Sequence, residues 1–143
     1  MSSDAFSRFS IVCLCAELLR RIAERVKKLV DYDVFTVMLW NESTQMLDSV
    51  FAMRYENAIP SRVSMPLSQG ITGNAAAERR TIRVNDVRLD ARYEPGESDV
   101  EVRSELVVPL LRQNRLVGVL DLESTMPNAF SAEHERPRDH CTK

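Results

Sequence analysis

Apolar residues recur every three or four positions near the start of the chain. They are Leu19, Ile22, Ala23, Val26, Leu29 and Val30, and charged residues occupy most positions between them. An apolar stripe with this period is typical of an amphipathic helix. The pattern predicts a helix over about residues 17–30. The preceding segment 1–16, with its apolar run at residues 11–16, is expected to extend that helix toward the N-terminus.

From residue 34 onward the pattern is one of short runs rich in β-branched and aromatic residues. Residues 34–40 and 47–55 are two such runs, and the turn-forming residues 41–44 join them, which predicts a β-hairpin. A short helix is expected near residues 74–80 and an extended segment at 81–84. Residues 85–102 read as a long loop, and residues 104–124 as a second hairpin that completes the sheet.

The second hairpin combines an apolar face with three acidic residues. A three-residue turn would place six small or apolar residues on one face: Leu106, Val108, Leu110, Gly118, Leu120 and Leu122. The other face then carries Glu105, Asp121 and Glu123 near one end. An unpaired buried charge costs several kcal/mol, so these acids must be solvated, paired with cations or ready to bind a ligand. For Glu123, pairing with Arg103, Arg112 or Arg115 is the favoured interpretation.

Composition narrows the class of protein. The 143 residues are 44% hydrophobic and 28% charged, which suits one globular domain. The net charge is −2 without a basic stripe, which argues against a nucleic acid partner. The apolar run near the start is too short to span a membrane, so a cytoplasmic protein without membrane contact is expected. Cys13, Cys15 and Cys141 lack metal-site spacing and are expected to be free thiols.

Several stretches in order resemble a GAF domain. They are "LLRRIAERVKKLVDYDVFTVMLWNE", "LSQGITGNAAAERRTIRVNDVRLDARY", "RSELVVPLLRQNRLVGVLDLES" and "NAFSAEH". The resemblance implies an α+β domain over residues 17–134. A central antiparallel sheet would carry terminal helices on one face, with ligand-pocket loops and short helices on the other.

The last residues depart from that family. Residues 135–143 contain Pro137 and no apolar periodicity, where the family has a long amphipathic helix. This tail is expected to be unstructured. Truncation, an altered reading frame and a natural solvated tail all stay open as explanations.

The same resemblance implies a small-molecule site. Glu105, Asp121 and Glu123 match positions that hold the substrate's amine in GAF-type free methionine-(R)-sulfoxide reductases, so an amine-bearing ligand is expected. Tyr93 and Trp40 are further candidates to line the pocket. The reductases need thiolates in the pocket loops, and "GITG" and "YEPGESDVEV" contain none. On that ground we expect no enzymatic activity.

Cofactors are not expected either. Covalent bilin binding and haem ligation need a pocket cysteine or histidine, and His134 and His140 both lie near the C-terminus. The cyclic-nucleotide signature of other GAF domains matches poorly. The sequence therefore predicts neither a metal ion nor a cofactor.

These observations lead to the interpretation of a non-catalytic sensory module in bacterial signal transduction. Ligand occupancy would reach a partner or effector through the terminal helices. The alternatives are a dimerisation scaffold with a vestigial pocket and, third, a reductase-like enzyme. A homodimer through the first helix, centred near Ile22 and Val26, is expected. Docking of that helix on its own sheet is the alternative.

Overall fold

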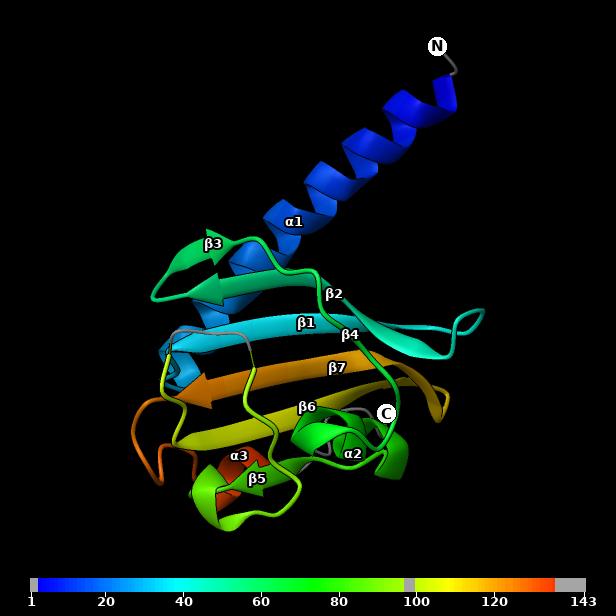
Figure 1. Ribbon diagram of the computed structural model, residues 1–143. Helices are drawn as coiled ribbons and strands as arrows, with labels where there is room; N and C mark the ends of the chain where they lie inside the picture. Colours follow the sequence, from blue (N-terminus) through cyan, green and yellow to red (C-terminus); the bar gives the residue numbers. More distant parts are fainter. Residues whose placement is uncertain (1–2, 97–99, 136–143) are drawn as a thin grey trace.

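The computed structural model describes residues 3–96 and 100–135, with the side chains of the first helix described from residue 15 onward. Its centre is an antiparallel sheet with the strand order β3-β2-β1-β7-β6-β5, and β4 pairs with the outer part of β2 (Figure 1). The fold is α+β, as expected from the sequence.

The strands are β1 (Val34–Asn41), β2 (Met46–Arg54), β3 (Asn57–Ile59), β4 (Ser64–Met65), β5 (Ile82–Val84), β6 (Ser104–Arg112) and β7 (Arg115–Ser124). Five of them follow the predicted runs closely, whereas β3 and β4 lie outside those runs. The helices are α1 (Ser3–Leu29), α2 (Gly70–Glu78) and α3 (Ala132–Glu135), with a 3-10 turn at Val87–Leu89 inside the long loop. None of the helices among the described residues is long and apolar enough to cross a membrane.

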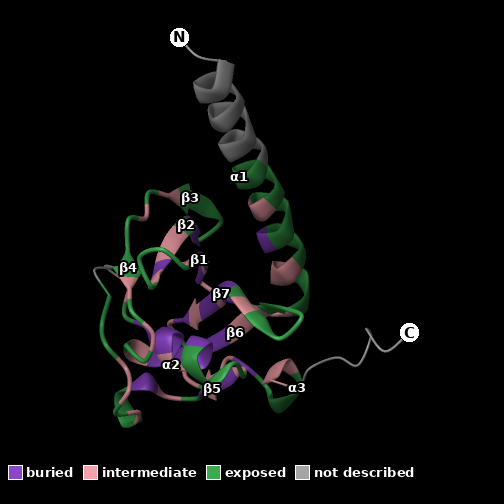
Figure 2. Cartoon of the chain, turned by 90° about the vertical axis from the view of Figure 1, so that its right-hand side faces the viewer, coloured by how far each residue is buried: buried purple, intermediate pink, exposed green. Residues whose placement is uncertain are grey.

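Two apolar cores lie on opposite faces of the sheet. One core contains Phe35, Phe51 and Leu122 and is covered by α1; the other contains Met38, Val107 and Val119 and is covered by α2. Figure 2 shows α1 and α3 on one side of the sheet and α2 on the other. This arrangement agrees with the expected division between terminal helices and pocket elements.

Helix α1 packs on the sheet only through its C-terminal half, and its N-terminal half extends beyond the sheet (Figure 1). Ala23 is completely buried, and Leu19 and Val26 pack against the same core. The apolar stripe of the sequence is therefore divided. One part, which includes Val26, packs against the chain's own sheet, and another part, which includes Ile22, is exposed.

The β6–β7 hairpin has the predicted faces but a different turn. Leu106 pairs with Leu122 and Leu110 with Gly118, as the apolar face requires. The turn itself has two residues, Gln113 and Asn114, both with positive φ, and a bulge at Leu110/Leu111 supplies the extra residue. Positive φ at both central residues is the signature of a type I′ hairpin turn. The bulge thus restores the register that a three-residue turn would have produced.

Candidate functional site

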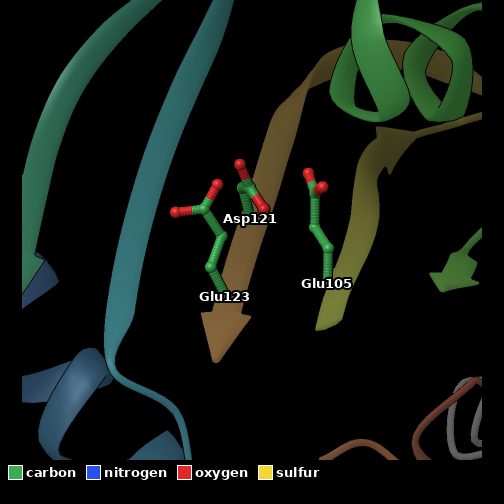
Figure 3. Close-up of side chains that lie close together, drawn as sticks. All are labelled: Glu105, Asp121 and Glu123. Carbon is green, nitrogen blue, oxygen red and sulfur yellow. The ribbon is translucent and has the colours of Figure 1, made fainter. Parts of the chain in front are cut away.

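The β6–β7 hairpin brings the three predicted acids together. Glu105 pairs directly with Glu123, and Asp121 lies two residues before Glu123 on the same strand, so all three side chains share one face. One carboxylate oxygen from each lies within 4.8 Å of the others (Figure 3). Glu105 is 3% exposed and Asp121 9% exposed. We refer to Glu105, Asp121 and Glu123 as the acidic cluster.

Helix α2 covers the acidic cluster and adds a hydroxyl group. The Thr72 Oγ1 lies 3.2 Å from Asp121 Oδ2 and 3.4 Å from Glu105 Oε1. A hydroxyl has one proton to donate, so it cannot satisfy both carboxylates at once. The backbone of residues 66–68 packs closely on α2 at Gly73, where a Cβ would lie 2.9 Å from the Pro66 carbonyl oxygen. Thr72 was not among the residues predicted from the sequence, although it lies in the "GITG" segment.

Burial raises the pKa of all three acids. For Glu105, burial and then the charges of Asp121 and Glu123 raise the pKa well above its usual range. Burial raises the pKa of Asp121 to about 6, although hydrogen bonds with Glu105 and Thr72 act in the opposite direction. Burial and the charge of Asp121 raise the pKa of Glu123 to about 8. The cluster therefore retains protons at neutral pH unless a cation approaches it.

No basic side chain of the described residues forms an ion pair with the acidic cluster. Arg103, one of the expected partners of Glu123, instead lies 3.7 Å from Asp86. Arg112 and Arg115 lie at the far end of the hairpin, where they are opposite each other on the two strands. The buried Asp121 Oδ1 has no hydrogen-bond partner among the described residues. The expected pairing of Glu123 with these arginines is therefore not found, and the acids remain without a countercharge at hydrogen-bond distance.

One cation does lie on the same face, two strands away. Val34 pairs with Glu123 on one side and with Arg54 on the other, so the three side chains point to the same face of the sheet. The positive charge of Arg54 partly offsets the rise in the pKa of Glu123. Its buried Nε has no hydrogen-bond partner among the described residues. Arg54 was not predicted from the sequence, since only the strand order β2-β1-β7 brings it near the cluster.

The two aromatic candidates lie in different places. Burial and then the charges of Glu123, Glu105 and Asp121 raise the pKa of Tyr93 to about 12, so its hydroxyl lies within electrostatic range of the acidic cluster. Trp40 is four residues beyond Thr36, the partner of Asp121, which is about 13 Å along the strand. Trp40 is therefore distant from the acids along the sheet.

The acidic cluster is suited to bind a cation. A buried ammonium group would receive hydrogen bonds from several carboxylate oxygens, and a hard metal ion would find oxygen ligands at short range. No thiol lies at the cluster among the described residues, and the chain has no cysteine between Cys15 and Cys141. Cys15 is exposed on α1, while Cys141 and the Cys13 side chain lie outside the described residues.

Comparison with characterised sequences identifies enzymes among the relatives. The chain is 34% identical over 74 residues to the free methionine-R-sulfoxide reductase of Escherichia coli, a match that covers 52% of this chain and 44% of that protein. It is 32% identical over 80 residues to protein YtsP of Bacillus subtilis, covering 54% of this chain and 47% of that protein. The chain thus spans about half the length of the curated relatives it matches.

The similar solved structures include a reductase and a GAF domain from another protein. The free methionine-R-sulfoxide reductase of Neisseria meningitidis, solved in complex with its substrate, has a TM-score of 0.70 and 25% identity, and the match covers 82% of this chain and 66% of that one. The GAF domain of an Acinetobacter phosphoenolpyruvate-protein phosphotransferase has a TM-score of 0.66 and 22% identity, with coverage of 94% and 86%. The second likeness supports the fold alone.

These relatives overturn one prediction and confirm another. The interpretation as a non-catalytic sensory module is wrong, because the sequence and structural relatives include free methionine-R-sulfoxide reductases, which are enzymes. That interpretation rested on the missing pocket thiols, although the acidic cluster is suited to bind an ammonium group. The resemblance to GAF domains is confirmed, since the family model described as "GAF domain" matches residues 16–136. The chain therefore belongs to the GAF domain family.

Proposed function

We propose that this domain binds free methionine-(R)-sulfoxide, or a free amino acid of the same class, and promotes its reduction with electrons from thiols. The acidic cluster is the observation that carries the proposal. Glu105 and Asp121 are buried, and the buried Nε of Arg54 on the same face has no hydrogen-bond partner among the described residues. No basic group of the described residues lies at hydrogen-bond distance from the cluster. The names of the E. coli and N. meningitidis relatives point to the same substrate.

The cluster supplies the ammonium site of the proposed complex. An α-ammonium group offers three N–H donors, which match the carboxylates of Glu105, Asp121 and Glu123. Binding would satisfy Asp121 Oδ1, which has no hydrogen-bond partner among the described residues. It would also lower the pKa values of the acids, since a nearby positive charge favours the ionised carboxylate. The α-carboxylate of the same ligand would be directed toward Arg54.

The reduction itself requires two thiols. A sulfoxide and two thiol groups give a thioether, a disulfide and water, so the oxygen leaves as water with both thiol protons. Because the described residues place no thiol at the cluster, we propose that soluble thiols supply these electrons. The protein would contribute binding and orientation of the sulfoxide. A thiol-dependent reaction fits a reducing compartment, and we propose the cytoplasm as its location.

Turnover tests this proposal directly. Purified protein is incubated with free methionine-(R)-sulfoxide and excess dithiothreitol, and methionine is measured by chromatography. We expect methionine formation above the rate with dithiothreitol alone, with a preference for the R over the S sulfoxide. A variant with Ser in place of Cys13, Cys15 and Cys141 should retain the activity.

Asp121→Asn supplies the control for the site. This change removes one buried negative charge, and we expect the apparent KM for the sulfoxide to rise at least about 30-fold, since losing one partner of a buried charge pair costs about 2 kcal/mol or more. Glu24→Gln, on the exposed surface of α1, should leave the KM unchanged. No stereoselective turnover in the unaltered protein would refute the reductase proposal.

We also propose that two copies associate through α1. Leu18, Ile22 and Leu29 are 58%, 39% and 68% exposed, and they lie beside the part of the helix that docks on the sheet. Their spacing of four and seven residues suits a coiled-coil seam. A second copy would cover this stripe with its own, in one self-complementary contact.

Sedimentation velocity across a range of concentrations tests the association. We expect a dimer that dissociates when both Leu18 and Ile22 are changed to Glu, and that is unaffected by Arg20→Glu on another side of the helix. Val26→Glu is unsuitable because Val26 packs in the core. A strict monomer at tens of micromolar would contradict the proposal.

A further inference from the structure

A groove lies at the turn end of the β6–β7 hairpin, away from the acidic cluster. It consists of two adjoining hollows of about 300 Å³ and about 400 Å³, which share Trp40, Glu42, Arg115 and Leu116. The last turn of α2 borders the first hollow, and the hairpin turn borders the second. We refer to this feature as the Trp40 groove. Hollows of this volume lie at the lower end of the range for small-molecule sites.

The lining of the groove includes apolar side chains and an oriented aromatic ring. Trp40 is half-buried, and its indole Nε1 donates a hydrogen bond of 2.7 Å to Glu42 Oε2. Leu67, Ala76 and Leu116 lie beside it. A half-buried indole with its N–H engaged offers a flat surface on which another planar ring can stack.

The rim of the groove is basic. Arg112 and Arg115 are direct cross-strand partners, so their side chains leave the hairpin on the same face. Like charges opposite each other destabilise a strand pair. Arg79, at the C-terminal end of α2, adds a third positive charge. None of these three arginines forms an ion pair with an acidic group of the described residues.

The basic rim is a local departure from the charge of the chain, which is −2 overall. Glu42 is the acidic side chain among the residues that line the groove, and its carboxylate is already engaged by Trp40. An anion bound between Arg112 and Arg115 would remove their mutual repulsion. The charges therefore favour an anionic occupant over a neutral or cationic one.

We propose that the Trp40 groove is a second binding site, for a small planar anion in which an aromatic ring carries a phosphate or carboxylate group. The ring stacks on Trp40, and the anionic group lies between Arg112 and Arg115. Guanidinium groups suit such anions because their planar N–H donors match phosphate and carboxylate oxygens. This site is independent of the proposed reductase function. Helix α2 joins the two sites, with Thr72 at the acidic cluster and Ala76 at the groove.

The single tryptophan of the chain reports occupancy of the groove. Tryptophan fluorescence is measured during titration with adenosine monophosphate, which combines a planar ring with a phosphate. Adenosine and inorganic phosphate serve as the two separate parts. We expect a saturable change with adenosine monophosphate and an affinity at least tenfold greater than for either part. Equal affinity for adenosine, or for phosphate alone, would overturn the proposal.

A matched pair of variants locates the binding. Changing both Arg112 and Arg115 to Ala should weaken adenosine monophosphate at least tenfold while unfolding temperature is maintained or raised. Arg62→Ala, which removes an exposed arginine outside the groove, should leave affinity unchanged. Equal losses in the two variants would show a nonspecific charge effect and refute the site. Absence of any saturable change in the unaltered protein would refute it as well.

Discussion

The two ends of the β6–β7 hairpin carry opposite charges in opposite environments. At one end Glu105 and Asp121 are buried and lack a countercharge at hydrogen-bond distance. At the other end Arg112 and Arg115 face each other in exposed positions. Burial raises the pKa values of the acids, whereas water screens the charges of the exposed arginines. Burial thus decides how strongly a charge without a partner is felt by the fold.

The largest difference between the two ends should appear in the pH dependence of stability. The pKa values of the acids are raised on folding, to about 6 for Asp121 and about 8 for Glu123, so the folded chain holds more protons than the unfolded one between about pH 4 and pH 8. The free energy of unfolding should therefore fall as pH rises through this range. Thermal unfolding at pH 5 and pH 8, without ligand, measures the effect.

Glu105→Gln should reduce this dependence. The variant keeps a hydrogen-bonding side chain but cannot ionise, and we expect it to gain about 1–3 kcal/mol at pH 8, or several degrees in Tm, with little gain at pH 5. Glu24→Gln is the matched exposed control and should change little at either pH. A Glu105→Gln variant that is less stable than the unaltered chain at pH 8 would contradict the assignment of a buried, uncompensated acid.

A smaller effect, on ligand affinity, is expected from Arg54, the cation near the acidic end. If Arg54 receives the α-carboxylate, free methionine-(R)-sulfoxide should bind about tenfold more tightly than its α-amide, corresponding to about 1.4 kcal/mol. Arg54→Met should abolish this preference, and Arg62→Met should preserve it. Isothermal titration calorimetry with both ligands decides the point. An undiminished preference in Arg54→Met would remove Arg54 from the binding site.

The smallest effect should be at the exposed end. Arg112→Thr removes one of two like charges from an exposed cross-strand pair, for which we expect a gain of about 0.2–1 kcal/mol that disappears in high salt. Chemical denaturation at low and high ionic strength measures it. If Arg112→Thr raised the free energy of unfolding as much as Glu105→Gln does at pH 8, the proposed difference between the buried and exposed ends would be contradicted.

The faces of the hairpin could be predicted from sequence, while its turn could not. Alternation of apolar and polar residues places Leu106 and Glu105 on opposite faces whatever connects the strands. The bulge at Leu110/Leu111 leaves that alternation intact on both sides, so the pattern alone gives the same faces for either turn. The pattern of apolar and polar residues therefore cannot distinguish a three-residue turn from a two-residue turn with a bulge.

Residues that reach the site through tertiary packing were harder to find. Glu105, Asp121 and Glu123 belong to one hairpin, and local register brings them together. Thr72 and Arg54 come from other elements, and their positions depend on how α2 docks and on the order of the strands. The helix illustrates the same limit, since periodicity predicted α1 but could not tell that Val26 packs inward while Ile22 is exposed.

The central claim is that the acidic cluster binds the ammonium group of a free amino acid, and one comparison of two ligands tests it most directly. Calorimetry at pH 7 compares free methionine-(R)-sulfoxide with its N-acetyl derivative, which keeps the sulfoxide and carboxylate but has no ammonium group. We predict that the free amino acid binds at least about 30-fold more tightly, the equivalent of about 2 kcal/mol. Equal or tighter binding of the N-acetyl compound would contradict the claim.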